Sequence, residues 1–165
     1  MEMTRQPDIQ NNVGFVKANL ADLIYSEAQF EDIQASYGEV EELIKGNTLH
    51  VVSDDDQLVV SNLRDAWNYV ISEVPDFNLS TIKKINGLVA KDESLEWGQL
   101  RTGSIQIGGV SYVPPVPDEE SVQHTLANMV GKGSSIIDTA LEVMLYLMRS
   151  QLFWDGNKRT AIPIR

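Results

Sequence analysis

The chain has 165 residues with a formal net charge of −11, and 42% of its residues are hydrophobic. Its size and apolar content predict one globular domain with a core of its own, and the absence of cysteine excludes disulfides and thiolate chemistry. The acidic balance disfavours a general nucleic-acid binder, which presents a basic face. No apolar run approaches the ~20 residues of a membrane span, and residues 1–7 lack the apolar core of a signal peptide. We therefore expect a cytoplasmic protein without a nucleic-acid or membrane partner.

Helical spacing of apolar residues organises the first part of the chain. It predicts one helix over about 14–33. After a break at Tyr37-Gly38, residues 39–45 are typical of a short acidic helix that ends at Gly46-Asn47. This part of the chain is therefore expected to be helical up to about residue 47.

Residues 48–60 are expected to be a connection, in which 48–52 and 58–60 are candidate short strands. The run Asp54-Asp55-Asp56 lies between them. It lacks the glycine and the distal glutamate of the usual calcium loop, so a solvated turn is the favoured interpretation.

Further helices are predicted from Ser61-Asn62 to Pro75, from about residue 78 or 80 onward, and from Asp118 to about 131–133. A helix over about 135–149 is the most apolar in the chain, and a helix that is apolar nearly all round is expected at the buried centre of a bundle. The stripe predicted to face inward consists of Ile137, Ala140, Leu141, Met144, Leu145 and Met148.

A small β-hairpin is predicted between these helices, within about residues 98–115. Gly108-Gly109 separates Ile105-Gln106-Ile107 from a second extended run that begins at Val110. The exposed edge of such a flap can capture an extended peptide by strand addition, whereas a hairpin that merely closes one end of the bundle is the alternative. The expected fold is all-α, a helical bundle with a β-hairpin flap, in one structural domain with N-terminal helices and a connection over 1–60 and a core over 61–165.

The stretch 151–161 carries the chemistry. Asp155 is suited to a hard cation, which prefers oxygen ligands, and Gly156-Asn157 allows a sharp backbone turn. Lys158 and Arg159 then lie in what is predicted to be the first turn of a helix, where cations are unfavourable unless an anion compensates them. This pattern indicates a site for a nucleotide or a phosphate.

The motif, the apolar helix before it and the glycine-rich hairpin together resemble the Fic/Doc (Fido) family, whose motif reads His-x-Phe-x-(Asp/Glu)-Gly-Asn-(Gly/Lys)-Arg. The matching residues are Phe153, Asp155, Gly156, Asn157, Lys158, Arg159, Thr160 and Ala161. Gly98–Arg101, Ile105–Gly109 and Tyr112–Pro115 are similar to the family's flap segment. The resemblance covers about residues 60–161.

This resemblance implies transfer of AMP from ATP to a protein hydroxyl. It implies that Asp155 holds Mg²⁺, and that the turn Gly156-Asn157 and the helix beginning at Lys158 form an anion hole. Arg159 is implied to neutralise phosphate charge in the transition state. The flap residues implied to align a protein target are Ile105, Gln106, Ile107, Gly108, Gly109 and Val110.

The sequence departs from the family at the catalytic position. Gln151 stands where the family has its general base, a histidine, and an amide cannot accept a proton at any working pH. Neither His50 nor His124 is expected to replace it. The expected protein is therefore a pseudoenzyme that binds ATP or another nucleotide with Mg²⁺ but is impaired in transfer.

Two more departures leave alternatives open. Lys158 belongs to the form of the motif that includes Doc-like members, which implies phosphoryl transfer, and Ile162 replaces a further arginine. The sequence stops at Arg165, where the family continues with more helices, so we interpret it as truncated after the motif. A fragment or a covering partner is the alternative. A non-catalytic interaction protein that docks through the flap is the third functional hypothesis, and the oligomeric state stays open.

Overall fold

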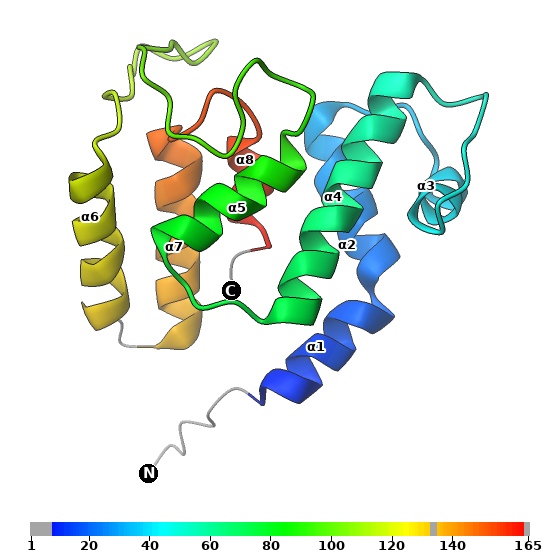
Figure 1. The fold of residues 1–165 in the computed structure, drawn as a ribbon, viewed down its shortest axis with the longest axis horizontal. Helices are drawn as coiled ribbons and strands as arrows, with labels where there is room; N and C mark the ends of the chain where they lie inside the picture. Colours follow the sequence, from blue (N-terminus) through cyan, green and yellow to red (C-terminus); the bar gives the residue numbers. More distant parts are fainter. Residues whose placement is uncertain (1–7, 133–134, 164–165) are drawn as a thin grey trace. The chain divides into compact units, whose positions relative to one another are not determined.

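The computed structural model describes residues 8–132 and 135–163, and every regular element in these ranges is helical (Figure 1). The all-α prediction is confirmed. The elements are α1 (Ile9–Ala18), α2 (Leu20–Ala28), the 3₁₀ helix η1 (Gln29–Glu31), α3 (Tyr37–Ile44), α4 (Asp54–Glu73), α5 (Leu79–Val89), α6 (Glu119–Lys132), α7 (Ile136–Ser150) and α8 (Asn157–Ala161). Within the described residues, none of these helices is both long enough and apolar enough to cross a membrane.

The chain divides into two compact units, 1–74 and 75–165. The first contains α1 to α4, with α2, α3 and α4 packed against one another. Its core includes a polar contact, because the indole N–H of Trp67 donates a hydrogen bond of 2.9 Å to the buried carboxylate of Glu27. The boundary predicted between residues 60 and 61 falls inside α4.

Three local predictions in the first unit were wrong. The helix predicted over 14–33 is two helices, since Asn19 ends α1 and its side chain donates to the carbonyl of Phe15. The predicted break at Tyr37-Gly38 is instead the start of α3, which Ser36 and Glu39 stabilise through a capping box.

The third error concerns residues 54–60, which are not a turn and a strand but the first two turns of α4. Ser53 caps this helix by accepting the N–H of Asp56 at 3.1 Å. The run Asp54–Asp56 therefore lies in the first helical turn, where the helix dipole favours negative charge.

The second unit contains α5 to α8. In it α8 packs against both α5 and α7, and α6 packs against α5 and α7. Asn78 caps α5 through the N–H of Thr81, and Asp118 accepts the N–H of Ser121 at the start of α6. The main-chain hydrogen bond and the hydroxyl of Ser121 lower the pKa of the Asp118 carboxyl. The packing of α8 against α5 and α7 places the loop between α7 and α8 beside the end of α5.

The prediction that the most apolar helix lies at the buried centre is wrong for α7 in this structure. Only Val143 and Leu147 are buried on it, whereas Ile137 and Leu145 are 72% and 61% exposed. The reason is that periodicity shows which face is apolar but not which neighbours exist to cover it. In the described residues α7 packs on α6 and α8. The predicted stripe is only partly covered, since Ala140, Met144 and Met148 are half-buried while Ile137, Leu141 and Leu145 are exposed.

The β-hairpin is not formed either. The predicted turn at Gly108-Gly109 is present, with a single hydrogen bond of 3.4 Å from the N–H of Val110 to the carbonyl of Ile107. No paired strands flank it within 104–113, and these residues form an extended loop. An isolated two-stranded ladder is weakly stable, and the glycine pattern predicts the turn without supplying a third strand to support the pair.

Candidate functional site

Two residues in the left-handed backbone region shape the loop between α7 and α8. Gln151 ends α7 with φ 47°, and Gly156 precedes α8 with φ 69°. Between them Leu152 and Phe153 are buried and hold the loop to the unit, while Trp154 and Asp155 are more exposed. The sharp turn predicted at Gly156-Asn157 is therefore present, with Asn157 as the first residue of α8.

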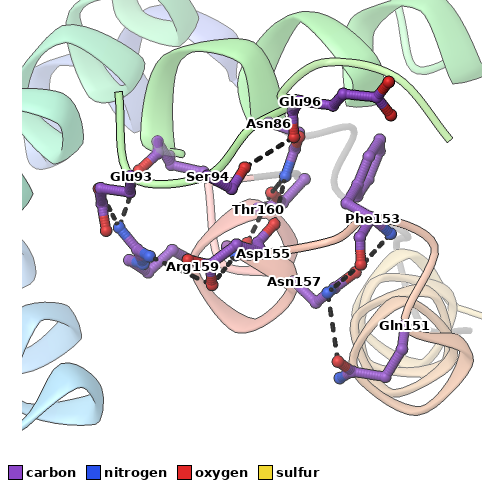
Figure 2. Close-up of polar contacts among 12 residues, drawn as sticks. Asn86, Glu93, Ser94, Glu96, Gln151, Phe153, Asp155, Asn157, Arg159 and Thr160 are labelled. Carbon is purple, nitrogen blue, oxygen red and sulfur yellow. Dashed lines mark hydrogen bonds and ion pairs between the residues drawn. The ribbon is translucent and has the colours of Figure 1, made fainter. Parts of the chain in front are cut away.

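Asn157 closes this loop through its side chain (Figure 2). Its Oδ1 accepts the N–H of Phe153 at 2.9 Å, and its Nδ2 donates to the carbonyl of Phe153 at 2.9 Å. The same Nδ2 donates to Oε1 of Gln151 at 3.2 Å. Because the amide of Asn157 is used inside the loop, only its main chain is available for the predicted contact with a phosphate.

The amide of Gln151 bonds to protein atoms at both ends. Its Nε2 donates to the carbonyl of Met148 at 2.6 Å, and its Oε1 accepts from Asn157. The predicted catalytic position therefore carries a side chain that helps to hold the loop. His124 lies exposed on α6 and contacts Asn128 of the same helix at 3.0 Å.

Asp155 and Arg159 lie one helical turn apart but in different environments. The side chain of Asp155 is 44% exposed, and its carboxylate accepts the N–H of Gly156 at 2.6 Å and lies 3.7 Å from Nη2 of Arg159. Arg159 is 1% exposed, and its Nη1 donates to the carbonyl of Val89 at 2.8 Å. The same Nη1 donates to Glu93 at 2.7 Å (Figure 2). The guanidinium predicted to meet phosphate is thus buried against the end of α5 and the turn after it.

The remaining predicted residues differ in exposure. Lys158 is exposed, whereas Gly156 is buried so closely that an added Cβ would lie 3.1 Å from Cβ of Ala90 and 3.2 Å from Cγ2 of Val89. The structure therefore brings Gln151 and 155–159 together at the loop between α7 and α8 and the start of α8. The predicted flap residues 105–110 lie in the neighbouring loop, where Ile105 and Ile107 are half-buried and Gln106 is exposed.

Asn86, which the sequence pattern did not single out, joins three segments. Its Nδ2 donates to the carbonyl of Asp155 at 2.9 Å and to Oγ1 of Thr160 at 3.1 Å, and its Oδ1 accepts the N–H of Gly98 at 2.8 Å. The side chain is fully buried. A buried amide needs its hydrogen bonds satisfied, so Asn86 fixes the motif loop relative to α5. Nothing in the local sequence distinguishes it from an ordinary helical residue.

Arg101 is the second residue without a predicted role of its own. Its main-chain N–H donates to the carbonyl of Leu152 at 3.0 Å, and its Nε donates to the carbonyl of Gln151 at 2.6 Å. Its Nη atoms donate to the carbonyls of Gly103, Pro114 and Pro115. Burial lowers the pKa of this guanidinium, while Tyr112 opposes that effect. Its place in the flap pattern was the only signal in the sequence.

A magnesium ion would have one acidic residue of the motif as a ligand. No group of three or more histidine, aspartate or glutamate side chains suited to a metal occurs in the described ranges. The half-exposed Asp155 carboxylate nevertheless fits Mg²⁺, which is bound in nucleotide sites by one or two carboxylates together with phosphate oxygens and water. The donor set therefore fits a metal ion whose remaining ligands are phosphate oxygens and water.

Comparison with known proteins agrees with the geometry. The family model described as the Fic/DOC family matches residues 76–163. A Fic domain containing signaling protein from Bacteroides thetaiotaomicron superposes with a TM-score of 0.75 at 18% identity, covering 96% of this chain and 64% of that one. Fic-1 from C. elegans superposes with a TM-score of 0.71 at 18% identity, covering 87% of this chain and 45% of that one. The chain therefore spans between about half and two thirds of the length of these structures. No curated protein matches it.

Proposed function

Because the chain belongs to the Fic/DOC family, we propose that it binds a nucleotide as Mg-ATP at 155–159 and transfers AMP to a protein hydroxyl poorly or not at all. Transfer of AMP requires the hydroxyl oxygen to form a bond to the α-phosphorus while the bond to the leaving pyrophosphate breaks. The hydroxyl proton must leave as well. A group that accepts it typically contributes about 10²–10⁴-fold to the rate.

The observation that carries this proposal is the state of Gln151. Its amide cannot titrate, and both of its ends are engaged, one with Met148 and one with Asn157. The side chain supports the loop without offering a proton acceptor. The site is thus consistent with a retained binding loop that lacks the group needed for efficient transfer.

The chemistry of 155–159 supports nucleotide binding. Asp155 would hold Mg²⁺, whose bound form bridges phosphate oxygens and offsets their charge. Lys158 is exposed in the first turn of α8 and would supply a cation for the phosphates. Arg159 would contribute only if its guanidinium turned from Glu93 toward the ligand, so we assign it a smaller part in the initial binding.

Calorimetric titration with Mg-ATP tests the binding step. We expect measurable heat with the wild-type chain, and Asp155→Ala is expected to weaken binding about tenfold, equivalent to about 1.4 kcal/mol. Asp55→Ala removes an exposed carboxylate from α4 and serves as the matched control, with unchanged affinity expected. Absence of heat from a folded wild-type sample at millimolar Mg-ATP would reject the proposal.

Restoring the base tests the transfer step and identifies the transferred group. With ATP labelled at the α-phosphate, Gln151→His is expected to raise labelling of protein targets in a lysate by about 10²-fold or more. ATP labelled at the γ-phosphate reports phosphoryl transfer, the reaction implied by the lysine form of the motif at Lys158. Wild-type labelling equal to that of Gln151→His would show that the chain does not need the missing base.

A further inference from the structure

The two ends of the loop 104–113 are held against the motif by one buried side chain. Arg101 is 1% exposed, and its guanidinium bridges three chain segments through main-chain carbonyls: Gln151 at the motif, Gly103 at the start of the loop, and Pro114-Pro115 at its end. Every hydrogen-bond acceptor that the described structure gives this side chain is a carbonyl. A buried cation without a carboxylate partner is costly unless its donors are used, and here they bind both ends of one loop.

Two more contacts place the start of this loop at the motif. The main-chain N–H of Arg101 donates to Leu152, so the two segments are also joined by their backbones. Gly103 packs directly on Trp154, since an added Cβ would lie only 2.7 Å from Cη2 of the indole. The indole N–H of Trp154 in turn donates to Glu96 at 3.0 Å.

The tip of the loop is held less firmly than its base. Residues 108–113 are exposed, and the aromatic ring of Tyr112 lies 4.9 Å from the guanidinium carbon of Arg149, which is also exposed. An exposed cation–π contact contributes about 0.5–1 kcal/mol. The loop is thus anchored at its base, with a tip that can adapt to what it meets.

We propose that Arg101 is a positioning residue that fixes the base of the 104–113 loop relative to residue 151. A protein segment bound along the loop would then arrive at a set distance from the motif. Arginine suits this task because its planar fork points donors in several directions at once, whereas a lysine ammonium is a compact point charge on a flexible stem. The role in presenting a target rests on the proposed function, but the mechanical role does not.

Hydrogen exchange on the full chain tests the mechanical role. Two hydrogen-bonded amides report on this loop: that of residue 101, which donates to Leu152 at its base, and that of Val110, which donates to Ile107 at its turn. In Arg101→Lys we expect these amides to exchange about tenfold faster or more, while α5 and α6 keep their wild-type protection. Arg64→Lys makes the same change on α4 and is expected to leave the loop unchanged. Wild-type exchange in Arg101→Lys would overturn the proposal, and so would a uniform increase over the whole unit.

A second variant perturbs the contact between residue 103 and Trp154 and leaves Arg101 unchanged. Gly103→Ala must displace the Trp154 indole, so we expect faster exchange of the same two amides together with a shift in tryptophan fluorescence. If Arg101→Lys does not fold, this variant decides the outcome, and unchanged loop exchange in it overturns the proposal.

The functional consequence is tested in the Gln151→His background. We expect Arg101→Lys to lower labelling of protein targets about tenfold or more while Mg-ATP affinity stays within about twofold. If only a buried positive charge were needed at position 101, Arg101→Lys would label protein targets as well as the Gln151→His chain does. That result would contradict a positioning role. If the wild-type chain does not bind Mg-ATP, the proposed function is rejected. The hydrogen-exchange comparison of Arg101→Lys with the wild type would still decide the mechanical role of Arg101.

Discussion

Gly156 is the residue of the motif loop on which its local conformation depends most. Its φ of 69° is strained for any residue with a Cβ, and the space around it is filled by Ala90 and Val89. We therefore expect Gly156→Ala to lower the free energy of unfolding by about 1–3 kcal/mol, from backbone strain together with crowding. Urea denaturation followed by circular dichroism measures the change.

Gly131→Ala is the matched control in the same unit. Gly131 lies within α6, and a Cβ there would meet nothing within 4 Å. The substitution is expected to be neutral or to stabilise the protein by up to about 1 kcal/mol, because alanine loses less entropy in a helix. Equal effects of the two variants would contradict the left-handed turn at residue 156.

The motif pattern was sufficient to locate the loop and to predict its turn, but not to orient its side chains. The partners of Arg159 are Val89 and Glu93, which precede it by 70 and 66 residues. A spacing rule within the motif carries no information about them. The same holds for Asn86, whose contacts reach 69 and 74 residues along the chain. Residue types indicate which chemistry the motif could carry, while packing decides where each group points.

At the scale of elements, α7 separates what periodicity predicts from what packing decides. Its apolar stripe predicted a helix correctly, yet Leu145 on that stripe is 61% exposed while Leu147 is 2% exposed. We expect Leu147→Ala to cost about 2–5 kcal/mol of unfolding free energy, since it leaves a cavity. Leu145→Ala should change stability by no more than about 0.5 kcal/mol, as an exposed position does.

These two variants control for each other, since they make the same chemical change on the same helix with similar effects on helix propensity. Thermal or urea unfolding of both, compared with the wild type, gives the difference directly. A cost at Leu145 as large as that at Leu147 would show that the exposed face of α7 is covered in solution.

Other elements show why local signals were misread. Ser53 and the acidic run after it form an N-terminal helix signal, but the same residues also suit a turn, and the apolar residues of 58–60 also suit a strand. The length of α4 decided the outcome, because 20 residues of helix bury one continuous stripe. In the 104–113 loop the predicted turn is present. Pairing of two strands around it depends on a further neighbouring strand, which the described residues do not supply.

At the scale of the whole molecule, the compact unit 75–165 agrees closely with the family match over 76–163. The predicted boundary at residue 60 followed the expected connection over 48–60, whereas the structural division follows Val74, which ends α4 with φ 43°. Proline at position 75 forbids the helix from continuing, so this signal was present in the sequence and was interpreted only as a helix end.

The net charge of −11 makes a prediction about how any nucleotide reaches the motif loop. An acidic protein repels an anionic ligand over a distance that shrinks from about 30 Å at 10 mM salt to about 8 Å at 150 mM. Basic phosphate-binding proteins lose affinity as salt rises. Here we expect calorimetry to find Mg-ATP bound at least as tightly at about 150 mM salt as at about 10 mM, because screening relieves the repulsion.

Two titrations separate this long-range electrostatic repulsion from the local contacts of the ligand. Uncharged adenosine should show no dependence on salt, and ATP with a chelator in place of magnesium should bind about tenfold more weakly than Mg-ATP, since its full charge meets the acidic surface. A tenfold loss of Mg-ATP affinity between the two salt concentrations would mean that local cations, with Lys158 the exposed one in the motif, outweigh the field of the rest of the chain. The sign of the salt dependence thus decides whether the motif loop acts as a basic site or as a metal-dependent site on an acidic protein.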